Sequence, residues 1–421
     1  MFTIVSELIA YIESLKRNEK KEDLNYMLKL SEVFGNPHLG KNFIHIGGTN
    51  GKGSTVTYVK EILLAAGYNV GTYISPYVVC FNERITYNND YICDEDILKY
   101  GNFIIAKFPL LDNLGMRYPS FFEFVTLMAF LYFTDLPKLD FAVIEVGIGG
   151  LLDCTNIIRP LISAITNVSY DHMNILGNTL TEIWANKLGI VKENTPFVTI
   201  KDDEHLWQIE KICRDKKAPL TLVDKKEAYD IIVDFTKTQF SYFDYSNIIL
   251  KMLGTYQVEN ALIALNIITI LAKKYNISKD NIYKGFLNAK WPGRLEIVNH
   301  NPLMMLDGAH NIDAIKRLSE FIAIVKKEKY VRLIFAVSSN KEKEIMISII
   351  EPFVDEIIFT HFSYKRSDEA EALFALSHHK NKRIINDIDE IIALCKKEQN
   401  IINIFCGSLF FVSELRSKFI K

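Results

Sequence analysis

The sequence predicts an α/β fold built from mostly parallel sheets that are covered by helices. Short runs rich in Val and Ile alternate with segments of helical periodicity, which is typical of such sheets. These runs form two sets, and the segment 230–253 between them alternates apolar and polar residues like a small antiparallel hairpin. A chain of 421 residues is also long for one compact core. We therefore expect two α/β domains and a small β-hairpin element.

The first set of strand-like runs lies in the N-terminal half. Each run is short and apolar, as expected for a strand that is buried on both faces. The runs are FIHIGG (43–48), VGTYISP (70–76), FAVIEVG (141–147), LISAITNV (161–168) and FVTI (197–200). A helix, STVTYVKEILLAAG (54–67), is expected after the first run.

The second set follows a predicted long helix, TYQVENALIALNIITILAKKY (255–275). Its runs are LMMLDG (303–308), VRLIFAV (331–337), VDEIIFT (354–360) and INIFCGS (402–408). The turn-forming segment KWPGRLE (290–296) precedes this set and is the best boundary candidate. We therefore expect one domain over residues 1–292 and another over residues 293–421.

Bulk composition argues against several classes of protein. Lysine plus arginine (49) nearly balances aspartate plus glutamate (51), so nucleic-acid binding through bulk charge is not expected. The longest apolar stretch, residues 121–133, contains Glu123 and is too short to span a bilayer. The N-terminal segment predicts an amphipathic helix, not a signal peptide. The scattered cysteines form no Cys-x-x-Cys pair, which favours reduced thiols in a cytoplasmic protein.

The stretch HIGGTNGKGSTVTYV (45–59) resembles a phosphate-binding loop with two departures from the usual Gly-x-x-x-x-Gly-Lys-[Ser/Thr] pattern. Ile46 replaces the first glycine, and Gly53 separates Lys52 from Ser54. The stretch nevertheless follows a predicted strand and opens a predicted helix. Its glycines allow backbone N–H groups to point at an anion, and the helix N-terminus and the lysine add positive charge. The alternative is a glycine-rich β–α turn that binds no nucleotide.

Polar residues occur at the ends of several runs in the first set. Glu145 interrupts FAVIEVG, Ser75 ends VGTYIS, and Asp171 and His172 follow LISAITNV. Ligands of open α/β sheets bind at the carboxyl ends of strands, and a buried carboxylate is costly unless a cation pairs with it. Together these residues suit a magnesium-nucleotide site, although His is an unusual magnesium ligand. Each of them alone is as well explained as a polar loop residue.

Lys187 lies on the apolar face of a predicted helix. Leu180, Trp184, Lys187 and Val191 recur at helical spacing after a Thr179-x-x-Glu182 capping box, whereas Lys192 is expected to be exposed. One interpretation is a lysine whose ammonium reaches the surface. The other is a buried lysine whose lowered pKa leaves a neutral amine that can add carbon dioxide and bind a metal as a carbamate.

The second half offers fewer candidates. Arg294 lies in the boundary turn, Asp307 ends the strand LMML, and His310 with Asn311 opens the next helix. An aspartate at a strand end can accept a ribose hydroxyl, and an arginine can hold a phosphate. Taken singly, each is better explained as a turn or cap residue.

In this order, these motifs resemble those of the folylpolyglutamate synthase and dihydrofolate synthase family of Mur-type ATP-dependent amide ligases. The resemblance covers nearly the whole chain, and the pair GTNGKGS (48–54) and LDGAHN (306–311) is its most specific part. Further matches are ISP (74–76), FNERI (81–85), FFE (121–123), EVGIGG (145–150), LDCTN (152–156), DH with LG (171–177), NKLGIVK (186–192), YQVENALIAL (256–265), WPGRLE (291–296) and GSL (407–409). The resemblance also explains the unusual loop sequence, because GTNGKGS is the family's own phosphate-loop pattern.

The resemblance implies a P-loop-type N-terminal domain, a C-terminal Rossmann-like α/β domain that binds glutamate, and a monomeric, cytoplasmic enzyme. It implies ATP, two Mg²⁺ ions and a carbamylated Lys187 as cofactors, with L-glutamate and a folate or dihydropteroate as substrates. The implied nucleotide contacts are Asn50, Gly51, Lys52, Gly53, Ser54, Asn260, Arg294 and Asp307. The implied metal ligands are Ser75, Glu145, His172 and Lys187, of which Glu145, His172 and Lys187 are also catalytic with Lys52. The implied pterin contacts are Ser120, Leu152, Asp153 and Cys154, and the implied glutamate contacts are His310 and Ser408.

Several positions depart from the family pattern and bear on substrate preference. They are Asn25, Tyr26, Tyr77, Leu151, Asn186 and the segment SSNKEKE (338–344). None belongs to the phosphate loop or to the implied metal ligands. Two other functions remain open: a nucleotide-dependent switch or transport ATPase without ligase chemistry, and a Mur-type ligase with a different acceptor, such as a cell-wall precursor.

Overall fold

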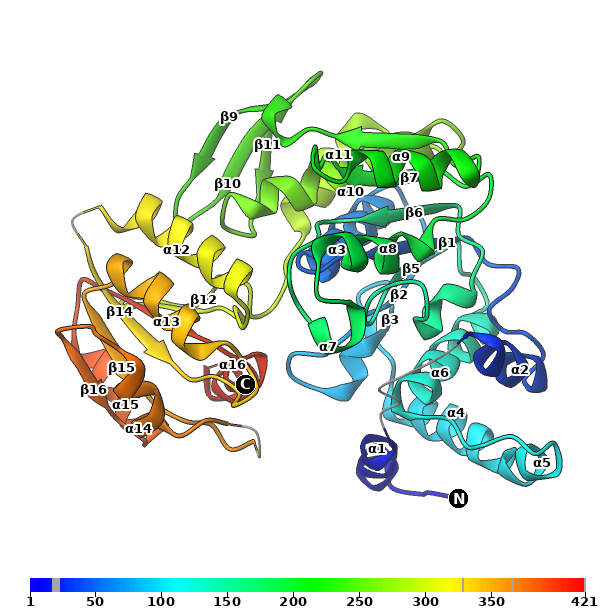
Figure 1. Cartoon of the computed structure of the whole chain (residues 1–421), viewed down its shortest axis with the longest axis horizontal. Helices are drawn as coiled ribbons and strands as arrows, with labels where there is room; N and C mark the ends of the chain where they lie inside the picture. The colour runs from blue at the N-terminus through cyan, green and yellow to red at the C-terminus, as the bar shows by residue number, and fades with distance from the viewer. Residues whose placement is uncertain (17–22, 328, 365–366, 420–421) are drawn as a thin grey trace. The chain divides into compact units, whose positions relative to one another are not determined.

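The computed structural model describes residues 1–16, 23–327, 329–364 and 367–419 (Figure 1). The chain forms two compact units. The first comprises Met1–Lys225 and Glu259–Phe286, and the second comprises Lys226–Val258 and Leu287–Lys421. The segment with the predicted hairpin therefore groups with the C-terminal unit. The functional division at residue 293 stays a prediction.

The first unit contains an eight-stranded sheet in the order β4-β3-β2-β5-β1-β6-β7-β8. The six strands from β2 to β8 in this order run parallel, and β3 and β4 are added antiparallel at one edge. The strands are β1 (Phe43–Gly47), β2 (Val70–Tyr73), β3 (Ile85–Tyr87), β4 (Asp90–Tyr91), β5 (Phe141–Glu145), β6 (Ile162–Ile165), β7 (Phe197–Ile200) and β8 (Leu220–Val223).

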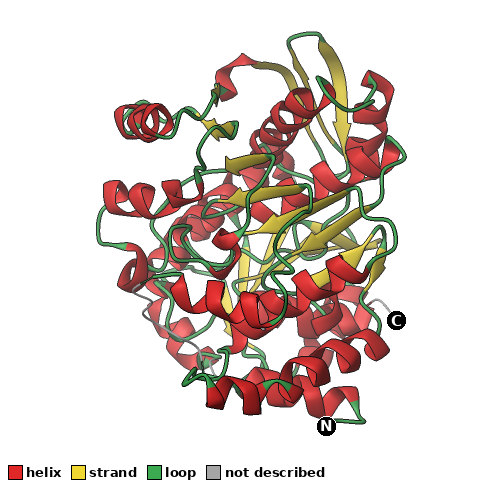
Figure 2. Cartoon of the chain, turned by 90° about the vertical axis from the view of Figure 1, so that its right-hand side faces the viewer, coloured by secondary structure: helices red, strands yellow, loops and turns green. Residues whose placement is uncertain are grey.

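Helices surround this sheet, some packed directly on its strands and others on neighbouring helices (Figure 2). They are α1 (Val5–Ser14), α2 (Asn25–Val33), α3 (Lys52–Ala65), α4 (Asp94–Ala106), α5 (Phe108–Asn113), α6 (Phe121–Asp135), α7 (Met173–Leu176), α8 (Leu180–Lys187), α9 (Leu206–Asp215), α10 (Tyr256–Ala272) and α11 (Lys279–Asn288). Short 3₁₀ turns are η1 (Phe81–Arg84), η2 (Cys154–Ile157) and η3 (Leu188–Ile190). In the part of the chain that is described, no helix combines the length and apolar character that crossing a bilayer requires.

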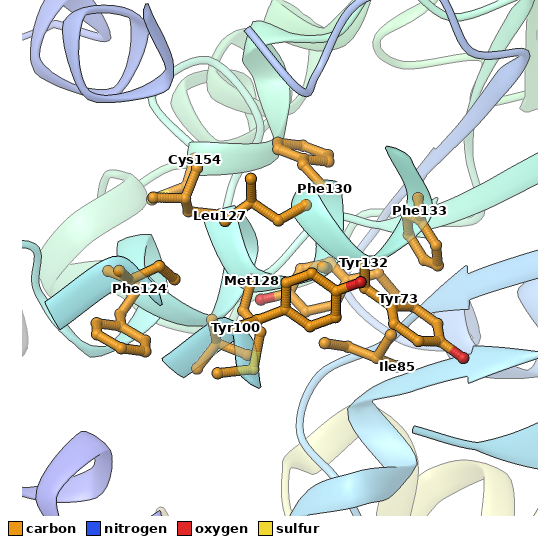
Figure 3. Packing of buried hydrophobic residues seen from close by; sticks show 14 of the residues in the cluster. Tyr73, Ile85, Tyr100, Phe124, Leu127, Met128, Phe130, Tyr132, Phe133 and Cys154 are labelled. Carbon is orange, nitrogen blue, oxygen red and sulfur yellow. The ribbon is translucent and has the colours of Figure 1, made fainter. Parts of the chain in front are cut away.

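Helix α6 is the centre of one hydrophobic core of this unit. Its sequence is apolar on nearly every side, and its residues from Phe124 to Phe133 are all buried. Figure 3 shows Leu127 and Phe130 of this helix among rings and aliphatic side chains from neighbouring elements, including Tyr73 of β2. Burying one such side chain stabilises the fold by about 1.5–3 kcal/mol. This packing fixes the elements whose ends carry the candidate site.

The second unit contains a six-stranded sheet in the order β12-β13-β17-β14-β15-β16. All its pairings are parallel except the edge pair of β12 and β13. The strands are β12 (Glu296–His300), β13 (Leu303–Leu306), β14 (Tyr330–Phe335), β15 (Glu356–Phe359), β16 (Lys382–Ile384) and β17 (Ile401–Cys406). The helices are α12 (Ile312–Lys326), α13 (Lys343–Ile350), α14 (Ala370–Leu376), α15 (Ile388–Lys397) and α16 (Leu409–Phe419). The predicted α/β fold is confirmed in both units.

Two elements differ in detail from the sequence-based prediction. The expected hairpin is a three-stranded antiparallel sheet of β9 (Ala228–Val233), β10 (Thr238–Tyr242) and β11 (Tyr245–Leu250). The helix that carries Lys187 ends there and continues as η3. A Cβ atom at Gly189 would lie 2.4 Å from the Leu151 Cα, so the backbone is packed too tightly there for another side chain. Val191 is buried, but it lies beyond the helix.

Strand β1 buries a histidine. His45 is fully buried between Ile44 and Ile46, and burial, with the charge of Lys192, lowers its pKa to about 3. An unfolded histidine has a pKa of about 6.5, so the unfolded chain binds one more proton between these two values. Above pH 6.5, His45 therefore does not lower the free energy of unfolding. As the pH falls from 6.5 towards 3, it lowers the free energy of unfolding by an increasing amount.

We expect the replacement His45→Gln to flatten the loss of stability below pH 6.5. Glutamine does not titrate, so the variant should gain on the native protein as the pH falls, with no such gain above pH 7. Urea denaturation at pH 7, 6, 5 and 4 measures this difference. Parallel curves for the two proteins across that range would contradict the assigned burial cost.

Candidate functional site

Four neighbouring strands of the first unit bring the N-terminal candidates to one edge of the sheet. Strands β2, β5, β1 and β6 are adjacent and parallel, so their carboxyl ends lie side by side. The loop 48–51 follows β1, Ser75 follows β2, and Glu145 ends β5. His172 lies in the segment after β6. The strand order therefore gathers residues that are up to 124 positions apart in the sequence, from Gly48 to His172.

The loop after β1 has room only for glycine at two positions. Gly48 and Gly51 have positive φ angles of 143° and 82°. A Cβ atom at Gly48 would lie 2.0 Å from the Thr166 Oγ1, and one at Gly51 would lie 2.0 Å from the Asn260 Oδ1. The Thr166 hydroxyl also donates to the Asn50 carbonyl at 2.6 Å. The structure thus places the predicted contact Asn260 directly against the loop.

We expect Gly51→Ala to raise the KM for ATP and to lower Tm. The left-handed backbone costs a residue with a side chain about 1–2 kcal/mol, and the new methyl group also collides with Asn260. Gly67→Ala is the matched control, because Gly67 has a φ of 86° but no atom within 4 Å of the position that a methyl group would occupy. The control should lose stability through φ alone and keep the native KM for ATP. Equal KM values for ATP in both variants would contradict the role of the close contact.

Lys52 begins helix α3 and points back over the loop. Its Nζ donates to the carbonyls of Gly48 at 3.2 Å and Thr49 at 3.0 Å, and it lies 4.0 Å from the Glu145 Oε1. The other oxygen of Glu145 accepts from the Ser75 backbone N–H at 3.1 Å. A cation, a buried carboxylate and a hydroxyl residue therefore meet beside a helix N-terminus, which favours anion binding. Gly53 and the buried Ser54 lie in the first turn of the same helix.

Lys187 is buried and does not reach the surface. Only 3% of it is exposed, and its Nζ donates to the Gly48 carbonyl at 2.9 Å. Burial, together with the positive charge of Lys52, lowers the pKa of Lys187 to about 7, although Asp171 and Asp153 oppose the shift. A large fraction of the amine is therefore neutral at physiological pH, as the second of the two sequence interpretations requires.

Lys192 corrects an expectation. The sequence pattern predicts an exposed side chain, but Lys192 is half-buried, and its Nζ donates to the Asn156 carbonyl at 2.7 Å. Burial, with the charges of Lys216 and Arg159, lowers its pKa to about 8. The helix ends before this residue, so helical periodicity does not decide where its side chain points.

His172 and Asp171 lie in the segment after β6, and His172 is the more exposed of the two. His172 has a φ of 48°, its side chain is 44% exposed, and its ring Nε2 lies 3.9 Å from the Asp171 Oδ1. Within the described ranges, no group of three or more His, Cys, Asp or Glu residues is arranged to hold a metal ion. The oxygens of Ser75 and Glu145 are nevertheless of the kind that Mg²⁺ prefers when phosphate oxygens and water complete its shell. The donor chemistry of these residues therefore fits magnesium.

The predicted pterin contacts surround the N-terminus of α6. Ser120 is buried and caps this helix, and Glu123 accepts both its N–H at 2.8 Å and its hydroxyl at 2.7 Å. Arg117 forms two hydrogen bonds to Glu123, at 2.7 and 2.8 Å, and its guanidinium lies 3.6 Å from the centre of the Tyr26 ring.

The other predicted pterin contacts differ in burial. Cys154 is fully buried in the core around α6. Leu152 is half-buried, and Asp153 is 5% exposed.

Arg117 is a residue that sequence analysis missed. Its partners Glu123 and Tyr26 lie 6 and 91 positions away, so no local pattern connects all three. The Tyr26 hydroxyl donates to the Arg117 carbonyl at 2.7 Å, which closes the contact. A stacked and paired guanidinium is held in one plane, because both its hydrogen bonds and its face are fixed.

The C-terminal candidates gather at one edge of the second sheet. Asp307 follows β13 and Ser408 follows β17, and these two strands are neighbours and parallel. Asp307 is buried and accepts N–H groups of Leu295 and Ala309, each at 2.9 Å. Burial raises its pKa, and the charge of Arg294 opposes the shift.

The remaining C-terminal candidates are held by local contacts. The His310 Nδ1 lies 2.7 Å from the Gly308 carbonyl, and Asn311 caps α12. The Ser408 Oγ accepts from the Phe410 N–H at 3.2 Å. His310 and Ser408 thus lie at the carboxyl edge of the sheet, whereas Asn260 belongs to the first unit.

Known proteins are similar to this chain in both sequence and fold. Residues 118–268 match the Mur ligase middle domain, and residues 293–409 match the Mur ligase, glutamate ligase domain. A dihydrofolate synthase/folylpolyglutamate synthase from Bacillus subtilis is 35% identical over 99% of this chain and 100% of its own length. The chain belongs to the folylpolyglutamate synthase/dihydrofolate synthase family. The resemblance inferred from the motifs is thereby confirmed.

Solved structures of this family have the same fold. A folylpolyglutamate synthase from Thermotoga maritima has a TM-score of 0.87 at 32% identity, covering 99% of this chain and 96% of that one. An FPGS–AMPPCP–folate complex has a TM-score of 0.81 at 28% identity and covers 100% of both chains. In that family member, an ATP analogue and folate are bound together.

Proposed function

We propose that the protein is an ATP-dependent ligase that adds L-glutamate to a folate and also to dihydropteroate. The observation that carries the proposal is the single edge at which Lys52, Glu145 and Lys187 surround the glycine loop. Such a pocket suits a triphosphate whose terminal phosphate is transferred to a carboxylate. The family relatives named for both synthase activities support the two acceptors.

The chemistry begins with an unreactive pair of substrates. A carboxylate and an amine form a salt rather than an amide in water, so the acid must first be activated. The acceptor carboxylate attacks the γ-phosphorus of ATP, the bond to the β-phosphate oxygen breaks, and an acyl phosphate and ADP form. The glutamate amine then attacks the acyl carbon, loses a proton, and inorganic phosphate leaves.

Residues of the first unit have defined tasks in this scheme. Lys52 neutralises charge on the transferred phosphoryl group, and backbone N–H groups of Gly51 and Gly53 hold the phosphates, assisted by Ser54. Asn50 contacts the nucleotide as part of the same loop, and its own N–H donates to the Asn167 Oδ1 at 2.9 Å. Asn260 orients the nucleotide from beside Gly51. These assignments rest on the position of each residue around the loop.

Two magnesium ions complete the proposal for the site. Ser75 and Glu145 would hold one, and His172 with a carbamylated Lys187 would hold the other; such ions neutralise charge on phosphate and carboxylate oxygens. The neutral Lys187 amine adds to carbon dioxide and releases one proton, which yields the carbamate. Its burial and its pKa near 7 support this modification.

The remaining substrate assignments are also proposals. Ser120, Leu152, Asp153 and Cys154 form the wall that meets the pterin, although the burial of Cys154 limits it to supporting that wall. Arg294 and Asp307 contact the nucleotide, and His310 and Ser408 contact glutamate. We further propose that the protein is a monomer in the cytoplasm. The six free thiols support the cytoplasmic location.

A paired assay tests the function. ADP release is measured with ATP and L-glutamate in the presence of either dihydropteroate or tetrahydrofolate, with glutamate and acceptor omitted in turn. A ligase requires both co-substrates, whereas a nucleotide switch or transport ATPase hydrolyses ATP without them. A cell-wall ligase would accept neither dihydropteroate nor tetrahydrofolate. Labelled glutamate in the product confirms that the amide bond has formed.

A further inference from the structure

A histidine that the ligase scheme does not use is connected to the acceptor side of the site. His45 is fully buried in β1, and its Nε2 lies 2.8 Å from the Oγ1 of Thr155. Its Nδ1 is buried and has no hydrogen-bond partner among the described residues. A buried polar atom without a partner is destabilising by about 1–3 kcal/mol, and an apolar residue would avoid that cost. Packing alone therefore does not account for a histidine here.

The direction of the hydrogen bonds follows from the number of protons. The Thr155 hydroxyl donates its one proton to the Asp153 Oδ1 at 2.5 Å, so its oxygen can only accept from His45. Burial lowers the pKa of His45 to about 3, so its ring is neutral and carries one proton. That proton must be on Nε2. The bonds therefore run from His45 to Thr155 and from Thr155 to Asp153.

Asp153 is the anchor of the loop that follows β5. Its Oδ1 also accepts the Thr155 N–H at 2.9 Å, and its Oδ2 accepts the Ile148 N–H at 3.0 Å. The carboxylate thus ties the start of this loop to its end. The Asn156 side chain adds bonds to the carbonyls of Leu151 at 3.1 Å and Gly189 at 3.0 Å. The position of the 147–154 segment therefore depends on the carboxylate of Asp153.

We propose that His45 is a positioning residue for the acceptor substrate, acting through Thr155 to fix the orientation of Asp153 and of the 147–154 segment. The proposal rests on the proposed function, because that function places the pterin against Leu152 and Asp153. His45 does not touch the acceptor. It removes the freedom of the Thr155 hydroxyl to rotate, so that the hydroxyl is always available to the carboxylate. Binding of the acceptor then carries no entropic cost for ordering this wall.

The test compares steady-state KM values for the acceptor and for ATP. His45→Leu removes the donor at similar volume, and we expect its KM for dihydropteroate or tetrahydrofolate to rise about ten-fold, with KM for ATP unchanged. Thr155→Val should give the same change, and the double variant should add nothing further because both belong to one chain of bonds. His45→Gln places an amide N–H near the position of Nε2 and should restore most of the acceptor KM.

Ser163→Ala is the matched control. Ser163 is paired with His45 in the register of β1 and β6, and its buried Oγ also has no partner among the described residues. Its hydroxyl is not part of the hydrogen bonds that link His45, Thr155 and Asp153, so the variant should keep the native KM for the acceptor. Tm of every variant separates folding from positioning.

Two outcomes would overturn the inference in different ways. If the native protein ligates glutamate but His45→Leu leaves acceptor KM unchanged, or raises both KM values equally, the positioning role is wrong while the function stands. If the native protein shows no acceptor-dependent ADP release, the proposed function fails and the inference fails with it.

Discussion

Replacing Lys52 with Ala is expected to lower kcat about 10²–10³-fold, since one lost charge contact to a transferring group has a cost of this size. Lys52 brings a full positive charge to the glycine loop. Its Nζ contacts the Gly48 and Thr49 carbonyls and lies near Glu145. The loss should appear in kcat for ligation and in ADP release alike. Coupled detection of ADP at saturating glutamate and acceptor measures it.

Lys60→Ala is the matched control for this variant. Lys60 lies two turns further along the same helix and pairs with Glu61 at 2.9 Å, away from the loop. Lys60→Ala makes the same substitution in the same helix but away from the phosphate site, so kcat should stay native. Native turnover in Lys52→Ala would show that the triphosphate is bound elsewhere.

Replacing Lys187 with Ala is expected to abolish ligation while ATP binding is largely kept. A carbamate on this lysine would supply anionic oxygens to the cation site proposed here, and alanine can form no carbamate. ATP is still held by the loop and by Lys52. Calorimetry with a non-hydrolysable ATP analogue measures binding, and product formation from labelled glutamate measures ligation.

A second variant separates the amine from the space it fills. Lys187→Met keeps most of the buried stem but has no nitrogen, so it should be as inactive as Lys187→Ala and more stable than it. Intact mass of the native protein, measured with and without added bicarbonate, reports the carbamate directly. Short carboxylic acids should restore part of the activity of Lys187→Ala, because they can enter the emptied space. Ligation close to the native rate in Lys187→Met would refute the carbamate role.

The central strands and helices could be predicted because their own side chains decide them. Runs such as FAVIEVG are apolar on both faces, so β5 lies where the pattern places it. The half-exposed strands β8 and β16 lack that signal, so the sequence pattern predicts neither of them. Their formation depends on pairing with a neighbouring strand, which the local sequence does not record.

The candidate site was predictable to the same extent. Periodicity places Lys187 on the apolar face of a helix but leaves open whether its side chain reaches the surface, and the structure shows that it is buried. Periodicity misplaced Lys192, whose partner Asn156 lies 36 positions away. The contacts among Arg117, Glu123 and Tyr26 were also out of reach, since the fold alone brings them together. Local patterns thus identify which residues are unusual, and tertiary contacts decide what each of them touches.

The carbonyl oxygen of Gly48 accepts hydrogen bonds from the side-chain nitrogens of two helices, Lys52 of α3 and Lys187 of α8. The glycine loop is consequently not an independent unit that can be transferred by itself. An engineer who grafts the strand–loop–helix segment into another scaffold transfers one of the two lysines and leaves the other behind. A functional transplant would have to include α8 and the packing that keeps its lysine dry.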